Sequence, residues 1–107
     1  MASGKLGAAD LAAATEVELY SPAASTLATV TVAFCNRGTA TAKIRIALSA
    51  SGDAAGTADD WLEYDRAILA HESFERTGIT VGSQGKIFVE SDTANVSAIA
   101  MGFEESV

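Results

Sequence analysis

The sequence predicts an all-β protein, an antiparallel β-sandwich of about seven strands with an immunoglobulin-like or jelly-roll-like topology. Two runs, Ala28–Asn36 and Ala42–Ser49, alternate apolar residues with small or polar ones, and Arg37-Gly38-Thr39 lies between them. A strand that buries one face requires this period of two, because successive side chains point to opposite sides of the sheet. No long run keeps the helical period of about 3.6 residues.

These two central runs supply the predicted core. Each run carries three large apolar residues at alternate positions, and we expect these residues to share one core: Val30, Val32, Phe34, Ile44, Ile46 and Leu48. Ala47 and Cys35 fall on the opposite faces of their strands. Cys35 is the only cysteine, so the chain cannot form an intramolecular disulfide, and the thiol is expected to act as a small hydrophobe.

The N-terminal part is predicted to contain an arm and one strand. Residues 1–13 are small and rich in Ala and Gly, which predicts a flexible arm before a single sandwich domain at 14–107. Thr15–Tyr20 then reads as a strand with Val17 and Leu19 facing in and Tyr20 facing out. Pro22 ends this strand because proline cannot donate to a ladder.

The C-terminal half reads as short strands separated by Gly, Asn, Asp and Ser. Ile87, Phe88 and Val89 are adjacent apolar residues, which indicates a strand buried on both faces. Ile79 and Val81 form a further short apolar stretch. The expected strands are Trp61–Ile68, Ser73–Thr77 with Phe74 inward, Lys86–Ser91 and Val96–Phe103.

The composition excludes several classes of function. A net charge of −7 and a pI near 4.4 argue against binding to nucleic acid or to an anionic membrane surface. No segment approaches the ~20 apolar residues that span a bilayer. The N-terminal residues lack the apolar core of a signal peptide, so we expect the chain to stay where it is synthesised.

Reactive constellations are also missing from the sequence, which predicts a protein that is not an enzyme and has no cofactor. His71 is the only histidine and falls in a predicted turn, which argues against a zinc site or a Cys-His pair with Cys35. Asp53, Asp59 and Asp60 lie in or beside the predicted loop, but their spacing does not match a calcium-binding EF-hand loop. We therefore expect no metal site.

Four arginines stand among carboxylates, several of them on predicted strands, and two interpretations stay open. They could form cross-strand ion pairs on the outer faces, or they could line a subunit interface, where arginine pairs bidentately with carboxylate. The residues concerned are Arg37, Arg45, Arg66 and Arg76 among Glu63, Asp65, Glu75 and Glu90, while Glu72 adds a further surface carboxylate. A carboxylate pair for glycoside hydrolysis would need a deep cleft, so charged outer faces are the expected role.

A family resemblance rests on an ordered set of segments: Cys35-Asn36-Arg37-Gly38, Glu63-Tyr64-Asp65, Glu75-Arg76-Thr77-Gly78-Ile79, Asp92-Thr93-Ala94-Asn95-Val96-Ser97 and Gly102-Phe103-Glu104-Glu105. This set resembles small virion structural proteins of tailed bacteriophages, closest to those of marine and cyanobacterial phages. The likeness runs from about Leu11 to Glu105. At Trp61-Leu62 the chain departs from the usual pattern, where a smaller aromatic and a β-branched residue are expected.

The resemblance implies a β-sandwich on the virion, made in the host cytoplasm and placed on the capsid surface as a decoration or cement protein. Its partner would then be the major capsid protein or another virion protein, and the chain would form a homo-oligomer, most simply a trimer. A tail, baseplate or fibre component is the alternative. A carbohydrate-binding module is a more distant one, with Trp61, Tyr64 and Tyr20 as stacking residues. The candidate interface residues are Lys5, Leu6, Arg37, Trp61, Tyr64 and Arg76.

Overall fold

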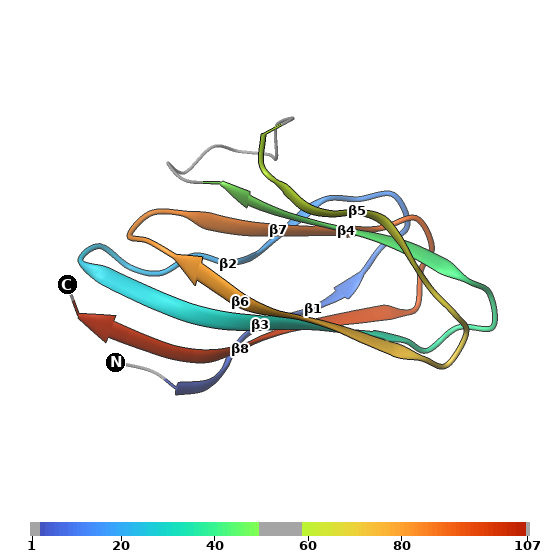
Figure 1. Cartoon of the computed structure of the whole chain (residues 1–107). Helices are drawn as coiled ribbons and strands as arrows, with labels where there is room; N and C mark the ends of the chain where they lie inside the picture. The colour runs from blue at the N-terminus through green and yellow to red at the C-terminus, as the bar shows by residue number, and fades with distance from the viewer. Residues whose placement is uncertain (1–2, 50–58, 107) are drawn as a thin grey trace.

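Two packed antiparallel sheets make up the computed structural model, which describes residues 3–49 and 59–106. The predicted β-sandwich is confirmed, with eight strands in the described residues instead of about seven (Figure 1). They are β1 (Ser3–Leu11), β2 (Val17–Tyr20), β3 (Thr26–Asn36), β4 (Ala42–Ser49), β5 (Trp61–Ile68), β6 (Ser73–Val81), β7 (Lys86–Ser91) and β8 (Val96–Ser106). The described part of the chain contains no helix that could cross a membrane.

The strand pairing is that of a jelly roll. β1 pairs with β8, β2 with β7, β3 with β6 and β4 with β5, as in one long hairpin folded on itself. Further pairing of β3 with β8 and of β4 with β7 rolls this hairpin into two sheets, in the orders β1-β8-β3-β6 and β2-β7-β4-β5. An immunoglobulin domain distributes its strands differently, so the topology selects the jelly-roll alternative.

The predicted flexible arm is wrong for the residues that the structure describes. Ser3–Leu11 forms β1, which pairs with β8 from Ser3 opposite Phe103 to Leu11 opposite Val96. Leu11 is only 2% exposed, and Leu6 packs against the core. Backbone pairing and these two leucines hold a segment whose small residues alone suggest flexibility. The sandwich therefore begins at β1 and not at residue 14, while residues 1 and 2 of the expected arm lie outside the described part.

The predicted core is largely confirmed. Val30, Val32, Phe34, Ile44 and Ile46 are each at most 1% exposed and belong to one cluster, and Leu48 is partly buried against it. The strand predicted to be buried on both faces is also confirmed, since Ile87, Phe88 and Val89 are at most 4% exposed. The expected strand Ser73–Thr77 and the short apolar stretch with Ile79 and Val81 form one continuous strand, β6.

Ala47 shows that the outer side of the second sheet is also partly covered. It pairs with Phe88 on one side and with Trp61 on the other. Ala47 is fully buried and Phe88 is 4% exposed, although neither belongs to the core cluster. The outer position predicted for Ala47 is therefore not a solvated one.

Replacing Ile46 by Ala should lower the free energy of unfolding by ~2–5 kcal/mol, because truncating a buried aliphatic side chain leaves a cavity. Ile46 is 0% exposed and lies at the centre of β4, between β5 and β7. Urea denaturation followed by circular dichroism measures the change. A loss below about 0.5 kcal/mol would contradict the assigned core.

Tyr20 corrects a predicted direction. The alternation placed its side chain outside, but the β2–β7 register shifts between Glu18 and Tyr20, and Tyr20 is 8% exposed. A bulge adds one residue and so reverses the facing of the residues after it. The Tyr20 hydroxyl donates a hydrogen bond to a Glu104 carboxylate oxygen on β8, which ties the two sheets together. Burial and this carboxylate both raise the pKa of Tyr20, so the hydroxyl keeps its proton.

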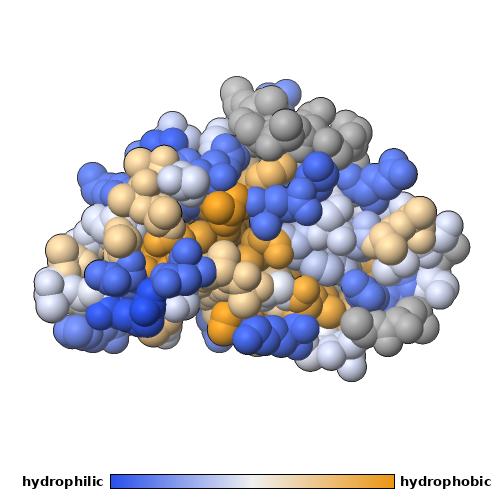
Figure 2. Space-filling model, turned by 180° about the vertical axis from the view of Figure 1, so that it is seen from behind, coloured by the Kyte–Doolittle hydropathy of each residue, from blue (hydrophilic) through white to orange (hydrophobic). Residues whose placement is uncertain are grey.

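Each of the four edge strands carries a register shift, whereas the two inner pairings are continuous. The shifts fall in the pairings of β1, β2, β5 and β6, and none falls between β3 and β8 or between β4 and β7. Bulged edges make poor templates for adding a further strand. Contacts with other molecules are therefore expected to use faces of the sandwich. On the face seen in Figure 2, apolar side chains gather across the middle between polar borders.

Candidate functional site

The titratable groups do not assemble into a reactive or metal-binding cluster within residues 3–49 and 59–106. No group of three or more His, Cys, Asp or Glu side chains in this part could hold a metal ion. Cys35 is exposed on the outer side of β3, and His71 lies in the turn between β5 and β6. Asp53 of the predicted loop lies outside the described residues.

Cross-strand ion pairs account for most of the described arginines, in line with the first of the two interpretations. Arg45 Nε lies 2.7 Å from Asp65 Oδ1, and Arg76 Nη1 lies 2.8 Å from Glu63 Oε2. Arg37 pairs with Asp10, a partner that the sequence pattern did not suggest. Two further cations make contacts of their own: Lys86 lies 3.4 Å from Glu18, and the Arg66 guanidinium lies 4.4 Å from the centre of the Phe74 ring.

Arg76 belongs to the edge at which β5 and β6 face each other from the two sheets. Its Nη1 donates to the Leu62 carbonyl oxygen at 3.2 Å as well as to Glu63. Arg66 of β5 lies over Phe74 of β6 at the same edge. These contacts close the sandwich along this side, so Arg76 is engaged within its own chain.

Among residues 3–49 and 59–106, the most exposed large apolar side chain forms a cluster with three neighbours, which we call the Tyr64 cluster: Arg45, Trp61, Tyr64 and Asp65. Tyr64 is 57% exposed, and its ring meets Trp61 at 5.2 Å and 75°, edge to face. The Arg45 guanidinium lies 4.0 Å from the centre of the Tyr64 ring. Asp65 holds that guanidinium by a hydrogen bond, which raises the pKa of Arg45 and lowers the pKa of Asp65.

This arrangement suits a protein contact better than a sugar. Tyrosine, tryptophan and arginine carry most of the binding energy in protein interfaces, above all where their conformations are fixed beforehand. Arg45 covers one face of the Tyr64 ring, and Trp61 stands nearly perpendicular to it, so the two rings do not form a flat stacking platform. Tyr20, the third stacking candidate, is buried.

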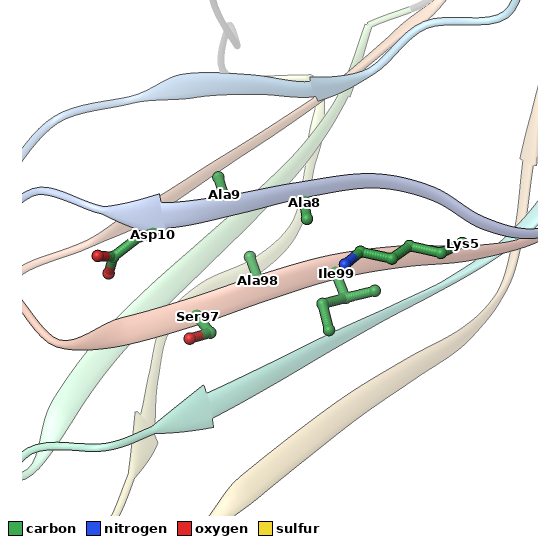
Figure 3. A pocket seen from close by; sticks show the side chains of 7 residues that line it. All are labelled: Lys5, Ala8, Ala9, Asp10, Ser97, Ala98 and Ile99. Carbon is green, nitrogen blue, oxygen red and sulfur yellow. The ribbon is translucent and has the colours of Figure 1, made fainter.

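A shallow hollow lies on the outer face of the other sheet, between β1 and β8. Its volume is about 330 Å³, and we call it the β1–β8 hollow. Figure 3 shows that it is bordered by Lys5, Ala8 and Asp10 from β1 and by Ser97 and Ile99 from β8. The side chains at its floor are small, whereas the longer side chains of Lys5 and Asp10 stand at its ends.

The six candidate interface residues thus separate into three places. Lys5 borders the β1–β8 hollow, and Arg37 reaches its end through Asp10. Trp61 and Tyr64 lie together on β5. Leu6 packs against the core and Arg76 closes the β5–β6 edge, so neither is presented as a free interface group.

The sequence reasoning missed Phe103, which is 52% exposed on β8. No signal in the sequence marks this exposure. On β8 the small residues Ala98 and Ala100 are buried, and the larger Ile99 is only half-buried. This is the reverse of the usual arrangement in a strand and marks the outer face of β8 as apolar.

Comparison with known proteins adds no relative: no family model matches this chain, and neither a curated protein nor a solved structure matches it.

Proposed function

We propose that this chain is a non-enzymatic structural protein of a tailed-phage virion, and specifically a decoration or cement protein that binds the outer surface of the capsid. The observation that carries the proposal is the Tyr64 cluster. It presents an exposed aromatic ring, held in place by Arg45 and Trp61, on the outside of a jelly roll. Jelly rolls are common in viral capsids and in lectins, and this fold-level analogy supports a virion role.

The mode of binding follows from the bulged edges of the sandwich. Because the edge strands are interrupted, strand addition to a neighbouring sheet is disfavoured. The protein would instead lay the Tyr64 cluster into a pocket of the major capsid protein. Many copies bound in this way would stabilise the shell by mass action, since a partner that binds only the assembled state favours that state.

A rebinding experiment tests this proposal. Phage particles stripped of the protein are mixed with purified chain, and the fraction that sediments with the particles is measured. Replacing Tyr64 by Ser should weaken retention about tenfold or more, as truncation of a central interface aromatic does. Leu69→Ser is the matched control, because Leu69 is 55% exposed but lies outside the Tyr64 cluster, and it should bind as the natural chain does.

The same experiment separates the alternatives. Binding to isolated tails and not to capsids would replace the decoration role with a tail, baseplate or fibre role. Equal retention of the Tyr64→Ser and Leu69→Ser variants would show that the Tyr64 cluster is not the contact. Binding of the natural chain to neither particle would overturn the virion proposal.

A further inference from the structure

The outer face of β8 carries a row of half-exposed apolar side chains. Ile99, Met101 and Phe103 alternate with buried or backbone-packed residues, so all three point away from the core. Phe103 is 52% exposed at one end of the row. At the other end, Ile99 borders the β1–β8 hollow. One strand therefore presents both a protruding aromatic ring and a recess on the same face.

The spacing of these two features is self-complementary. Phe103 lies five residues beyond Ala98, the β8 residue at the centre of the hollow, which is about 17 Å along a strand. The midpoint falls beside Met101. A two-fold axis at that point, lying in the plane of the interface and across β8, would place Phe103 of each copy over the hollow of the other.

We propose that a second copy of this chain docks on this face, forming an isologous dimer in which the two β8 strands run antiparallel. In such a dimer, each residue pair occurs twice, which is the defining property of a two-fold interface. Phe103 fills the recess beside Ala8 and Ser97 of the other copy. Met101 packs near its own symmetry mate, where its flexible thioether can adapt to the contact.

Charge supports the same register. Glu105 is exposed and lies four residues beyond Met101 on β8. Arg37 starts beside Val96, five residues before Met101, because the neighbouring Asn36 pairs with Val96 and Arg37 N donates to the Asn95 carbonyl oxygen. The two-fold axis therefore brings Glu105 of one copy to Arg37 of the other. The pair with Asp10 uses Nη2 of Arg37, and a guanidinium has further N–H donors.

The size of the face is sufficient for a stable contact. Four strands at their normal spacing make a sheet about 19 Å wide, and about nine residues along each strand give about 30 Å. The flat area is then roughly 600 Å² per copy, so a dimer would bury more than the roughly 1,000 Å² total that specific interfaces need. Lys5 pairs with Met101 and therefore lies at the axis, where its side chain must turn away from the hollow to make room for Phe103 of the other copy.

This inference does not depend on the proposed capsid role, and it replaces the trimer that the family resemblance implies. It also uses the sheet opposite to the one carrying the Tyr64 cluster. A dimer joined at β8 would leave both Tyr64 clusters free to engage a larger assembly.

Sedimentation equilibrium of the purified full chain tests the proposal. The natural chain should approach twice its mass of 10.9 kDa at high concentration. Phe103→Ser should raise the dissociation constant of the dimer about tenfold or more. Ser97→Trp should do so as well, by filling the recess without changing Phe103. Tyr64→Ser is the matched control, since Tyr64 is a similarly exposed aromatic residue, and it should leave the dimer intact.

A charge swap tests the register itself. Arg37→Glu and Glu105→Arg should each weaken the dimer several-fold, and the double variant should restore it. Within one chain these residues lie about 30 Å apart along β8, so restoration cannot come from an internal pair. The repulsion between Glu at position 37 and Asp10 is present in both the single and the double variant.

Each contrary result overturns the proposal. If the natural chain stays monomeric up to about 100 μM, the dissociation constant of any dimer lies above that concentration, and the proposed specific dimer is excluded. A trimer mass would return the assembly to the three-fold alternative. Equal effects of Phe103→Ser and Tyr64→Ser, or no restoration by the double charge swap, would show that β8 is not the interface.

Discussion

Replacing Gly102 by Ala should lower the free energy of unfolding by about 2–5 kcal/mol, because steric overlap and backbone strain add at this position. A Cβ atom at Gly102 would lie 2.0 Å from the Thr29 carbonyl oxygen and 3.0 Å from its carbonyl carbon. Gly102 also has a φ of +152°, which side chains rarely adopt. The neighbouring atoms are backbone, and β3 pairs with β8 without interruption from Thr26 to Asn36, so neither strand can move aside alone.

Gly82→Ala is the matched control for this substitution. A Cβ atom at Gly82 would meet no atom within 4 Å, so the change should stay within about 0.5 kcal/mol. Urea denaturation of the two variants and the natural chain, followed by far-UV circular dichroism, measures both effects. Equal stability of Gly102→Ala and Gly82→Ala would contradict the close pairing of β8 with β3.

A strand could be predicted where large apolar residues alternate along its buried face. It was missed where small residues are held in the sheet mainly by backbone pairing. Val30, Val32 and Phe34 alternate strictly, so the sequence pattern locates their strand and their core face. Ser3–Leu11 shows no such pattern because its small residues pack by close backbone approach. At Gly7, for example, a Cβ atom would lie 2.3 Å from the Leu19 carbonyl oxygen. Only the pairing with β8 reveals this strand.

Bulges limited the prediction of side-chain direction in the same way. The alternation gives the facing of Leu19 correctly, but the register shift beside it turns Tyr20 inward to Glu104. A pattern with a period of two cannot anticipate one inserted residue.

The sequence indicated which residue types belong to the candidate site, but it did not indicate which of these residues lie close together. Trp61 and Tyr64 are three residues apart, which in a regular strand places two side chains on opposite faces, so their contact depends on the register shifts of β5. Lys5 and Arg37 approach the same hollow only because β1 pairs with β8 and β8 pairs with β3. Phe103 stayed hidden because a large residue facing outward and small residues facing inward reverse the usual order. Such an arrangement is recognised only when the opposite sheet, which fills the core, is known.

Asn36 gives the last prediction, which concerns the end of the sandwich away from the termini. Asn36 is 1% exposed, and both polar atoms of its side-chain amide form hydrogen bonds. Nδ2 donates to the carbonyl oxygens of Ala40 at 2.8 Å, Ile68 at 3.0 Å and Leu69 at 3.3 Å, and Oδ1 accepts from Gly38 N at 3.0 Å. One amide therefore joins the β3–β4 turn to the β5–β6 turn.

Replacing Asn36 by Ala should lower the free energy of unfolding by about 2–4 kcal/mol, because one buried and three partly buried hydrogen bonds would be lost at once. Asn36→Asp should be at least as harmful despite its nearly unchanged volume, since a carboxylate cannot donate to carbonyl oxygens and is costly to bury. Thr39→Ala, an exposed position in the same turn, is the control and should change stability by less than about 0.5 kcal/mol. Urea denaturation distinguishes these outcomes. If Asn36→Asp kept the natural stability, the amide would not join the two turns, and their arrangement would have to come from the strands alone.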